Sequence, residues 1–539
     1  MIMSTSTPLA QPLTRPTLGR RQFLFGGAAL ALAACTSSSK GSTGTTTAGA
    51  TETASHTTEA SGCYSITSDT GAATLQEVLA DASVHTEGFN LLWIPPTLTG
   101  TKFDLSLAAS TVQFFDGAAT DTIGYNGASF WGPTLIMRKG DTVGLTVANA
   151  LDEEITTHWH GLHLPAEMDG GPMQPIAAGC TWAAAFEVMN NAATYWYHPH
   201  AHELTWKQLN QGAGGFIIVQ DDDEDALALP RTYGVDDIPL ILTSRKFGSD
   251  NAIETDGIYG DHMLTNGTLS AEVNLPAQLV RFRILNGEIE RVYNLGFGDD
   301  RTFHVITTDG GLVDTPVPVT RLLMAPGERY EIVVDLGGDA AGSAVEFKAY
   351  NGGQPFGFPG GEPGTTGAFG SLLNDTTFDI LRINVIAAKA NGITALPATL
   401  ATNALWSAPD ATNDRTIRIT DTGPGSPFTF NDAGYDMTTI NETVVLDTVE
   451  KWSIQNGAVF SHSFHIHDVQ FSIVSRSTGE VRDYEKGWKD TLYIFTNETV
   501  EFVAKFDDFA SDDHPFMYHC HMANHEDEGL MGQFLVVEA

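Results

Sequence analysis

The feature that most constrains the fold of this chain is a His-x-His pair that occurs four times. The pairs are His158 and His160, His198 and His200, His465 and His467, and His519 and His521. In a β-strand, alternate side chains point to the same face, so both imidazoles of each pair would share one face of a sheet. The pairs use eight of the 17 histidines, which makes chance a poor explanation. A site formed by all eight of these histidines would combine residues 158–200 with residues 465–521, which lie far apart in the chain.

Cys520 stands between the two histidines of the last pair and would point to the opposite face of the same strand. That strand can therefore supply ligands to two different metal centres. Thiolate with imidazole selects copper, and a His₂Cys set with a weak or absent axial ligand is typical of a blue-copper electron-transfer site. His462, Cys520 and His525 remain as such a set. We predict one mononuclear thiolate site and one cluster for about three metal ions.

Most of the remaining sequence consists of short β-type runs separated by Gly, Pro, Asn and Asp. Examples are TLIMRKGDTVGLTVANA, RYEIVVDL and ETVEFVAKF. Few windows show the periodicity of a helix. The pattern predicts an all-β chain built from Greek-key sandwiches.

Three boundary signals divide this β-rich sequence. The acidic run 221–225 is predicted to be a solvated linker, and a Gly/Pro-rich segment spans 351–370, with a further linker near 389–400. The segments KGDTVGLTVANA, LPAQLVRFRILNG and VVLDTVEKWSIQNG occupy similar places and indicate a weak internal repeat. We predict three consecutive sandwiches, over residues 64–225, 226–388 and 389–539.

The N-terminal residues carry signals for export. Arg20-Arg21-Gln22-Phe23-Leu24, followed by the apolar run FGGAALALAA, predicts a twin-arginine signal over residues 1–35. Its last residues, LAAC, resemble a bacterial lipobox in which Cys35 would be lipidated; the alternative is a plain signal peptide with an incidental cysteine. Residues 36–63 read as a flexible Ser/Thr-rich linker. We expect a periplasmic or cell-surface protein, either tethered to a membrane or free.

The charge balance restricts the partners. The chain has 66 acidic and 28 basic residues and a net charge of −38, which argues against nucleic acid as a partner. The acidity serves solubility, or it attracts cations that include metal-ion substrates. In an exported protein, Cys63 and Cys180 could form one disulfide.

With these motifs, residues 64–539 resemble the three-domain multicopper oxidases. The resemblance is to the branch of bacterial laccases, cuprous oxidases and bilirubin oxidases, because FHIHDVQF replaces the HxHGHxF form of fungal and plant laccases. It implies cupredoxin domains and four copper ions: one type 1, one type 2 and two type 3. By this resemblance His462, Cys520 and His525 would bind the type 1 copper, His158 and His465 the type 2 copper, and His160, His198, His200, His467, His519 and His521 the type 3 pair.

The resemblance implies an oxidase that takes single electrons from a small reductant and reduces O₂ to water with four of them. Cys520 and its neighbouring histidines would give a short covalent route from the type 1 site to the cluster. Asp169 and Glu526 match the family's acidic residues near the cluster and would relay protons. The alternatives are that Asp169 caps a glycine turn and that Glu526 is a surface charge. Trp159 and Trp196 are expected to pack beside the cluster.

Two departures from this branch bear on the reductant. Leu530 occupies the axial position, where the branch usually has Met, and Met531 matches the residue that follows. Ala458 replaces an acidic residue of the cuprous oxidases. Both favour phenols or aromatic amines, as in laccases; the alternative is oxidation of Cu(I), Fe(II) or Mn(II). Rivals outside the class are a copper carrier and a copper-free structural or division protein, against which the complete ligand set speaks. Neither the physiological reductant nor the oligomeric state is predicted.

Overall fold

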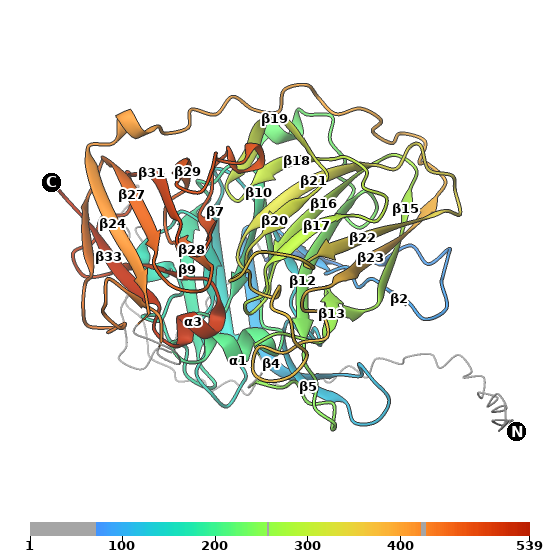
Figure 1. The fold of residues 1–539 in the computed structure, drawn as a ribbon, viewed down its shortest axis with the longest axis horizontal. Helices are drawn as coiled ribbons and strands as arrows, with labels where there is room; N and C mark the ends of the chain where they lie inside the picture. Colours follow the sequence, from blue (N-terminus) through green and yellow to red (C-terminus); the bar gives the residue numbers. More distant parts are fainter. Residues whose placement is uncertain (1–71, 256–257, 422–426) are drawn as a thin grey trace, which may run out of the picture. The chain divides into compact units, whose positions relative to one another are not determined.

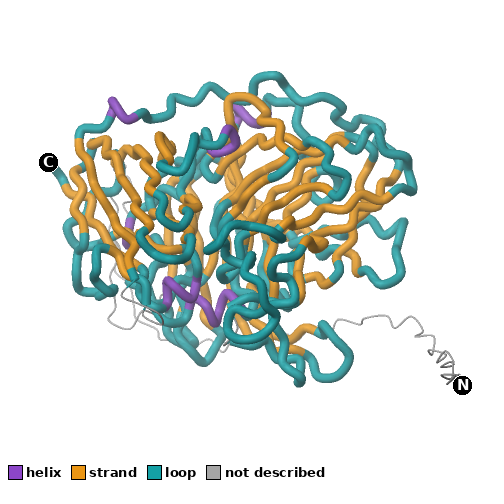
Figure 2. The backbone as a smooth tube through the Cα atoms, in the orientation of Figure 1, coloured by secondary structure: helices purple, strands orange, loops and turns teal. Residues whose placement is uncertain are grey.

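The computed structural model describes residues 72–539, apart from 256–257 and 422–426. Strands dominate it and the helices are short, so the all-β prediction is confirmed (Figure 2). The export signal, the linker 36–63 and Cys63 lie outside the described residues, whereas Cys180 is disulfide-bonded. Among the helices in the described part, none is both long enough and apolar enough to cross a membrane.

The first two sheets share one buried apolar core. The larger sheet has the strand order β1 (Thr74–Gln76), β3 (Thr97–Thr99), β6 (Thr134–Arg138), β11 (Gly215–Gln220), β10 (Ala193–His198) and β8 (His158–His160). The smaller sheet has the order β5 (Thr120–Tyr125), β4 (Lys102–Val112), β7 (Thr142–Asn149) and β9 (Thr181–Glu187). We call this pair of sheets the first sandwich.

The next two sheets form the middle sandwich around a second core. One has the order β14 (Thr268–Leu269), β13 (His262–Thr265), β12 (Asp237–Arg245), β16 (Leu279–Asn286), β21 (Arg329–Asp335), β18 (Phe303–Thr308) and β19 (Gly311–Val319). The other has the order β2 (Asn90–Leu91), β15 (Ala271–Pro276), β23 (Thr377–Ile386), β22 (Ala344–Tyr350), β17 (Tyr293–Phe297) and β20 (Leu322–Met324). Strand β2 precedes the first sandwich's main strands in the chain, yet it pairs with β15 of the middle one.

The last two sheets form the last sandwich, which Figure 1 draws in orange and red. One has the order β25 (Thr429–Phe430), β24 (Asn413–Thr420), β27 (Thr448–Asn456), β31 (Thr499–Phe506) and β29 (Phe471–Arg476). The other has the order β26 (Glu442–Val445), β33 (Met531–Val537), β32 (Phe516–Cys520), β28 (His462–Ile466) and β30 (Thr491–Ile494). The boundaries near residues 225 and 388 stay predictions.

The acidic run 221–225 is not only the solvated linker that its charge predicts. Asp221 caps a short helix, α2 (Asp222–Asp225), by accepting the backbone N–H of Glu224 at 2.8 Å. Glu224 is buried and pairs with Arg281 of β16 at 2.8 Å. A neighbouring buried guanidinium therefore draws part of this run into the protein interior, which the charge pattern alone does not reveal.

Two other short helices join the first and last sandwiches. Helix α1 (Thr205–Asn210) lies beside α3 (Ala523–Asp527), low in the view of Figure 1. The carboxylate of Asp527 accepts the backbone N–H groups of Thr205 at 3.1 Å and Trp206 at 2.8 Å. Because the first N–H groups of a helix have no partner within it, this contact completes α1.

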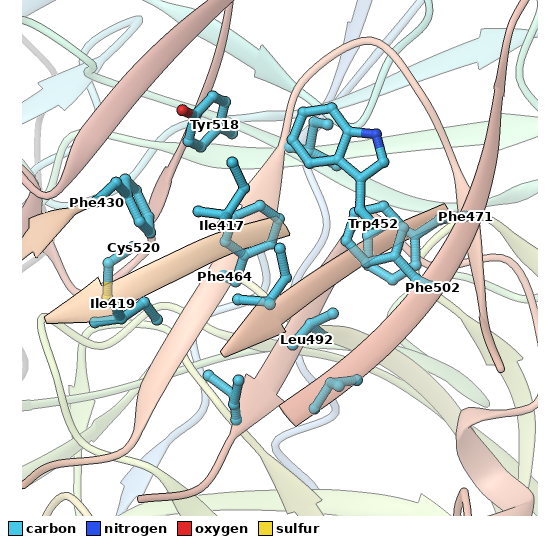
Figure 3. Close-up of a cluster of buried hydrophobic side chains, with 14 of the residues drawn as sticks. Ile417, Ile419, Phe430, Trp452, Phe464, Phe471, Leu492, Phe502, Tyr518 and Cys520 are labelled. Carbon is cyan, nitrogen blue, oxygen red and sulfur yellow. The ribbon is translucent and has the colours of Figure 1, made fainter. Parts of the chain in front are cut away.

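The core of the last sandwich shows how strand alternation divides the ligands. Phe464 of β28 and Tyr518 of β32 point into this core, and Cys520 lies among the same buried side chains (Figure 3). Phe464 pairs with Cys520 and His465 with His519 across the two antiparallel strands. His465 and His519 therefore lie on the face that points away from the core.

Candidate copper centres

In the first sandwich, the same alternation brings four histidines together. Trp159 of β8 and Tyr197 of β10 point into the core, so their neighbours point outward. The two strands are antiparallel, with His198 opposite His158. His200 follows β10 immediately and is also buried.

The outward faces of β8 and β28 meet between the first and last sandwiches. The rings of His160 and His465 stack with centroids 3.8 Å apart, and those of His158 and His467 stack at 3.9 Å. All eight imidazoles of the four pairs are at most 2% exposed. The structure thus brings the four His-x-His pairs into one buried cluster. Trp196 stacks on His198 with centroids 4.1 Å apart, as expected, whereas Trp159 belongs to the apolar core.

Within this cluster, imidazole nitrogens face one another in two groups. His160 Nδ1 lies 3.2 Å from His521 Nε2 and 3.4 Å from His198 Nε2. In the second group, His200 Nε2 lies 3.2 Å from His519 Nε2, with the His467 ring beside both. The group of His200, His467 and His519 can hold one metal ion.

The second nitrogen of each ring shows which nitrogen is free for a metal. His465 Nδ1 donates to the backbone carbonyl of Asp490 at 2.9 Å, and His158 Nδ1 to that of Asp169 at 2.9 Å. His519 Nδ1 lies 3.1 Å from the carbonyl oxygen of Cys520. An imidazole that donates through Nδ1 keeps its lone pair on Nε2. Buried Nε2 atoms without a hydrogen-bond partner are those of His158, His465 and His467.

The electrostatics of the cluster suit a metal. Burial, and after it the neighbouring imidazoles, lower the pKa of His160, His465 and His467 well below the ordinary value. The same causes act on His198 and His521. These rings are therefore neutral, which is the form that ligates metals. Facing lone pairs on buried neutral rings repel each other unless a cation lies between them.

His462, Cys520 and His525 form a separate buried group. Cys520 Sγ lies 3.5 Å from His462 Nδ1 and 3.6 Å from His525 Nδ1. His462 shares the core-facing side of β28 with Phe464, and His525 comes from α3. Burial raises the pKa of the Cys520 thiol to about 12 and lowers the pKa of His525 to about 3. The thiol proton must therefore leave when a metal ion binds.

Leu530, the residue that the sequence predicted for the axial position, is joined to this group through its backbone. It is completely buried, and its backbone N–H donates to the carbonyl of His525 at 2.9 Å. Leu530 belongs to the apolar core of the last sandwich. An aliphatic side chain offers no donor atom, so Leu530 would add no ligand to the His₂Cys set if copper bound there.

Asp169 and Glu526 are both buried against the cluster, in the places that the sequence predicted. Asp169 Oδ2 accepts from His467 Nδ1 at 2.5 Å, and Oδ1 lies 3.1 Å from His158 Nδ1. Glu526 lies between His200 Nδ1 at 3.1 Å and His519 Nδ1 at 3.2 Å. Burial opposes ionisation of both carboxyl groups, but the neighbouring histidines hold each pKa below its usual range.

Three further residues near the histidines have no recognisable sequence signal. Asp490 Oδ1 lies 3.2 Å from His160 Nε2, and Arg329 binds both Asp490 oxygens at 2.6 Å. Glu290, from the middle sandwich, lies 4.0 Å from His525 Nε2. No motif surrounds these residues, and their contacts join strands far apart in the sequence. The histidine pairs alone could not have revealed them.

Comparison with known proteins agrees with this geometry. Three family models described as multicopper oxidase match residues 106–224, 242–343 and 408–539. The chain is 30% identical to "Multicopper oxidase mco" of Staphylococcus haemolyticus over 445 residues, which cover 81% of this chain and 88% of that protein. It is also 30% identical to "Cell division protein FtsP" of Escherichia coli over 460 residues, covering 82% and 92%.

Among solved structures, a laccase-like multicopper oxidase, CueO, from an Ochrobactrum species is 31% identical. Its TM-score is 0.73, and the match covers 83% of this chain and 100% of that one. These matches span all three sandwiches, which are of the cupredoxin-like type found in such proteins. Together with the buried His and Cys groups, they show that this chain belongs to the multicopper oxidase family, whose members are copper oxidoreductases that use O₂.

Proposed function

We propose that this chain is a laccase-like oxidase that takes single electrons from a phenol or aromatic amine and reduces O₂ to water. The carrying observation is that Cys520 belongs to one metal-ligand group while its neighbours His519 and His521 belong to the other. When bound, one type 1 copper ion would accept single electrons, and one type 2 and two type 3 copper ions would deliver four of them to O₂. The eleven His and Cys residues named above are the proposed ligands.

Aromatic side chains around His462 and His525 support an aromatic reductant. The Phe428 ring lies 4.7 Å from the ring centroid of each of these histidines. Phe460 packs edge-on to Phe428, and Phe369, which is 45% exposed, stacks on Phe460 at 5.7 Å. Aromatic rings prefer offset-stacked and edge-to-face contacts with other rings. A phenol on this patch would lie close to the histidine edges that receive its electron.

Leu530 also supports this reductant. An apolar axial position favours the reduced, singly charged form of a copper ion and so raises its potential. A higher potential suits the removal of electrons from phenols.

Asp169 and Glu526 are the proposed proton relays. Reduction of one O₂ to two waters consumes four protons, which must enter a buried cluster. Each carboxylate touches two of the proposed ligand histidines and is itself buried, and its lowered pKa means that it would pass a proton on to the cluster instead of keeping it. In addition, both fix the Nδ1–H tautomer of the rings they touch.

Oxidation of metal ions is the second candidate, and the observation that favours it is a pair of carboxylates near His525. Glu290 and Glu362 both accept from the hydroxyl of Tyr259 at 3.2 Å, and Glu290 Oε2 is buried without a partner. Carboxylate oxygens bind metal cations. In a metal-ion oxidase, these residues would supply the acidic group that is missing at Ala458.

We further propose that the protein is exported by the twin-arginine route and held by a lipid on Cys35. The support is the sequence Arg20-Arg21-Gln22-Phe23-Leu24 and the LAAC tetrapeptide. Mass spectrometry of the protein from its native membrane fraction tests the anchor. A mature chain that begins at an unmodified residue would contradict it.

The enzymatic proposal is tested by O₂ uptake of the copper-loaded chain with 2,6-dimethoxyphenol or with Cu(I) as the sole reductant. We expect faster uptake with the phenol, and no uptake and no blue colour in Cys520→Ser. Preference for Cu(I), together with at least tenfold slower Cu(I) oxidation in Glu290→Gln, would instead establish the metal-ion oxidase. If the chain takes up no O₂ with the phenol and none with Cu(I), both the laccase-like oxidase and the metal-ion oxidase are contradicted.

A further inference from the structure

We propose that Asp490 is a positioning residue for the copper cluster, and that the middle sandwich, which supplies no proposed copper ligand, controls it through Arg329. The inference rests on the proposed function, because it requires the histidine cluster to hold copper. Its basis is a set of buried hydrogen bonds that connect all three sandwiches.

Asp490 fixes two histidines from opposite ends of the chain. Its side chain accepts from His160 Nε2 at 3.2 Å, and its backbone carbonyl accepts from His465 Nδ1 at 2.9 Å. These rings stack on each other at 3.8 Å, with planes 14° apart. Because Nε2 of His160 carries the proton, the lone pair of His160 is on Nδ1, the atom that faces His521 and His198. Asp490 therefore selects the ligating nitrogen of His160.

Arg329 holds the Asp490 carboxylate in one orientation. Its two terminal nitrogens donate to Oδ1 and Oδ2 of Asp490, each at 2.6 Å, and both side chains are completely buried. A bidentate guanidinium prevents the carboxylate from rotating. Nε of Arg329 donates to the carbonyl of Thr194 at 3.1 Å, in the strand that carries His198. Arg329 thus contacts the first and the last sandwich at once.

A second buried ion pair restrains the contact between Arg329 and Asp490. Lys489, next to Asp490, donates to Glu328, next to Arg329, at 2.9 Å. Lys489 also reaches Asp309 at 3.0 Å, and Asp309 accepts the backbone N–H of Arg329 at 2.8 Å. The dipeptides Glu328-Arg329 and Lys489-Asp490 are therefore paired residue by residue, with opposite charges at each position. Buried charges persist only when paired in this way, so the contact tolerates few alternative geometries.

Asp490 lies close enough to His160 and His465 to be a metal ligand itself. Both of its oxygens already accept short hydrogen bonds from Arg329. His160 also approaches it through Nε2, the nitrogen opposite the one that faces the other histidines. Asp490 is thus an orienting partner of a ligand, a role whose loss typically lowers metal affinity or activity by about 10- to 100-fold.

The test compares Asp490→Leu with Asp237→Leu in the full-length, copper-loaded protein. Asp237 is the matched control, because it is 3% exposed and Arg283 binds both its oxygens at 2.8 Å. In the described part of the chain, its hydrogen bonds and ion pairs involve no histidine. Each substitution removes a carboxylate that binds a buried arginine through both oxygens, and each arginine keeps a second acidic partner: Arg283 lies 2.7 Å from Glu331 and Arg329 lies 3.7 Å from Asp309. Only Asp490→Leu also removes the hydrogen-bond partner of a proposed copper ligand, His160.

The readouts are copper per chain, the blue absorption of type 1 copper, the near-ultraviolet absorption of the type 3 pair, and the type 2 signal in electron paramagnetic resonance. We expect Asp490→Leu to keep the blue absorption, to lose most of the type 2 and type 3 signals, and to reduce O₂ more than tenfold more slowly. Asp490→Asn, which keeps an acceptor for His160, should recover part of these signals. Asp237→Leu should keep all of them.

Equal type 2 and type 3 signals in Asp490→Leu and Asp237→Leu would overturn the inference. Circular dichroism checks folding; if Asp490→Leu does not fold, Arg329→Lys replaces it, because a lysine keeps the charge but not the two-pronged contact. Arg329→Lys is expected to show the same selective loss of the type 2 and type 3 signals, and undiminished type 2 and type 3 signals in this variant would also overturn the inference. If the unaltered chain itself takes up no copper, the proposed function fails first, and this inference fails with it.

Discussion

Most histidines of the cluster are oriented by what their second ring nitrogen touches; His521, whose Nδ1 is buried without a partner, is an exception. Asp169, Glu526 and Asp490 contact such nitrogens from three directions, and backbone carbonyls contact others. The His-x-His spacing tells which face of a strand each imidazole occupies, but it does not tell which nitrogen is free. Which nitrogen is free depends on hydrogen-bond acceptors that other segments of the chain contribute. The residues that gather in the cluster could therefore be predicted from sequence, whereas the tautomers of their rings could not.

At this scale, Asp169→Ala should slow O₂ reduction by about 100-fold or more, a typical contribution of one proton-transfer group. The substitution removes the carboxylate that holds His467 and His158 and that would carry protons. Stopped-flow mixing of oxidised enzyme with phenol under nitrogen should show unchanged bleaching of the blue absorption. Asp379→Asn, a change at an exposed side chain of β23 in the middle sandwich, is the control. Slower bleaching in Asp169→Ala would contradict a role confined to the cluster.

Gly327 allows the middle sandwich to approach a ligand ring. Its φ of 85° lies in the left-handed region, and an added Cβ would lie 2.7 Å from the His521 imidazole. Gly327→Ala should therefore displace His521 and lower the near-ultraviolet absorption of the type 3 pair, while the blue absorption is retained. Gly353→Ala is the control, because it also has positive φ, 71°, but has open space around it. Equal spectra in the two variants would show that strain, and not contact with His521, matters.

At the scale of elements, strand alternation explains most of what could be predicted. In β28, His462 and Phe464 share one face and His465 shares the other with Ser463. A single strand therefore separates the ligands of the two centres, as the sequence indicated for His519, Cys520 and His521. Contacts between elements that lie far apart in the sequence could not be predicted in this way. The acidic run 221–225 reads as a linker, because Arg281, which draws Glu224 inward, is more than fifty residues away in the chain.

The junction of α1 and α3 should make stability depend on pH. Burial, and after it Glu526, raises the pKa of Asp527 to about 8 from an ordinary value of 3.8. The folded chain thus binds a proton that the unfolded chain has released, so stability falls as pH rises between about 4 and 8. Asp527→Asn does not titrate and keeps one acceptor for α1. Its melting temperature, relative to that of the unaltered chain, should rise across this range.

The measurement is differential scanning calorimetry of the copper-free chain and of Asp527→Asn at pH 5, 7 and 9. Asp121→Asn, on the exposed side of β5, controls for the loss of one carboxylate. A difference in melting temperature that stays constant with pH would contradict the assignment.

At the scale of the whole molecule, the middle sandwich supplies none of the proposed copper ligands, but it shapes both centres. Arg329 acts through Asp490, Gly327 packs on His521, and Glu290 lies near His525. Nothing in the sequence of this sandwich resembles a metal motif. Its contribution comes from docking against strands of the other two, which local patterns do not encode. The all-β class, by contrast, follows from local patterns and could be predicted.

Copper should also hold the sandwiches together. A ligand that binds only the folded state stabilises it by about 4 kcal/mol at a concentration 1,000 times its dissociation constant. Removal of copper with a chelator should therefore lower the melting temperature more than Cys520→Ser does, because only the cluster spans two sandwiches. Calorimetry before and after chelation, and after copper is restored, measures this. A larger effect of Cys520→Ser would contradict it.

The division of the ligands between the two ends of the chain has a consequence for synthesis on the ribosome. The His₂Cys group lies within residues 462–525, whereas the cluster needs side chains from His158 to His521. A growing chain that has emerged only as far as the middle sandwich carries four cluster histidines and no route for electrons to reach them. Neither centre can therefore be completed before the last sandwich has been synthesised, so copper can fill both centres only in the finished chain.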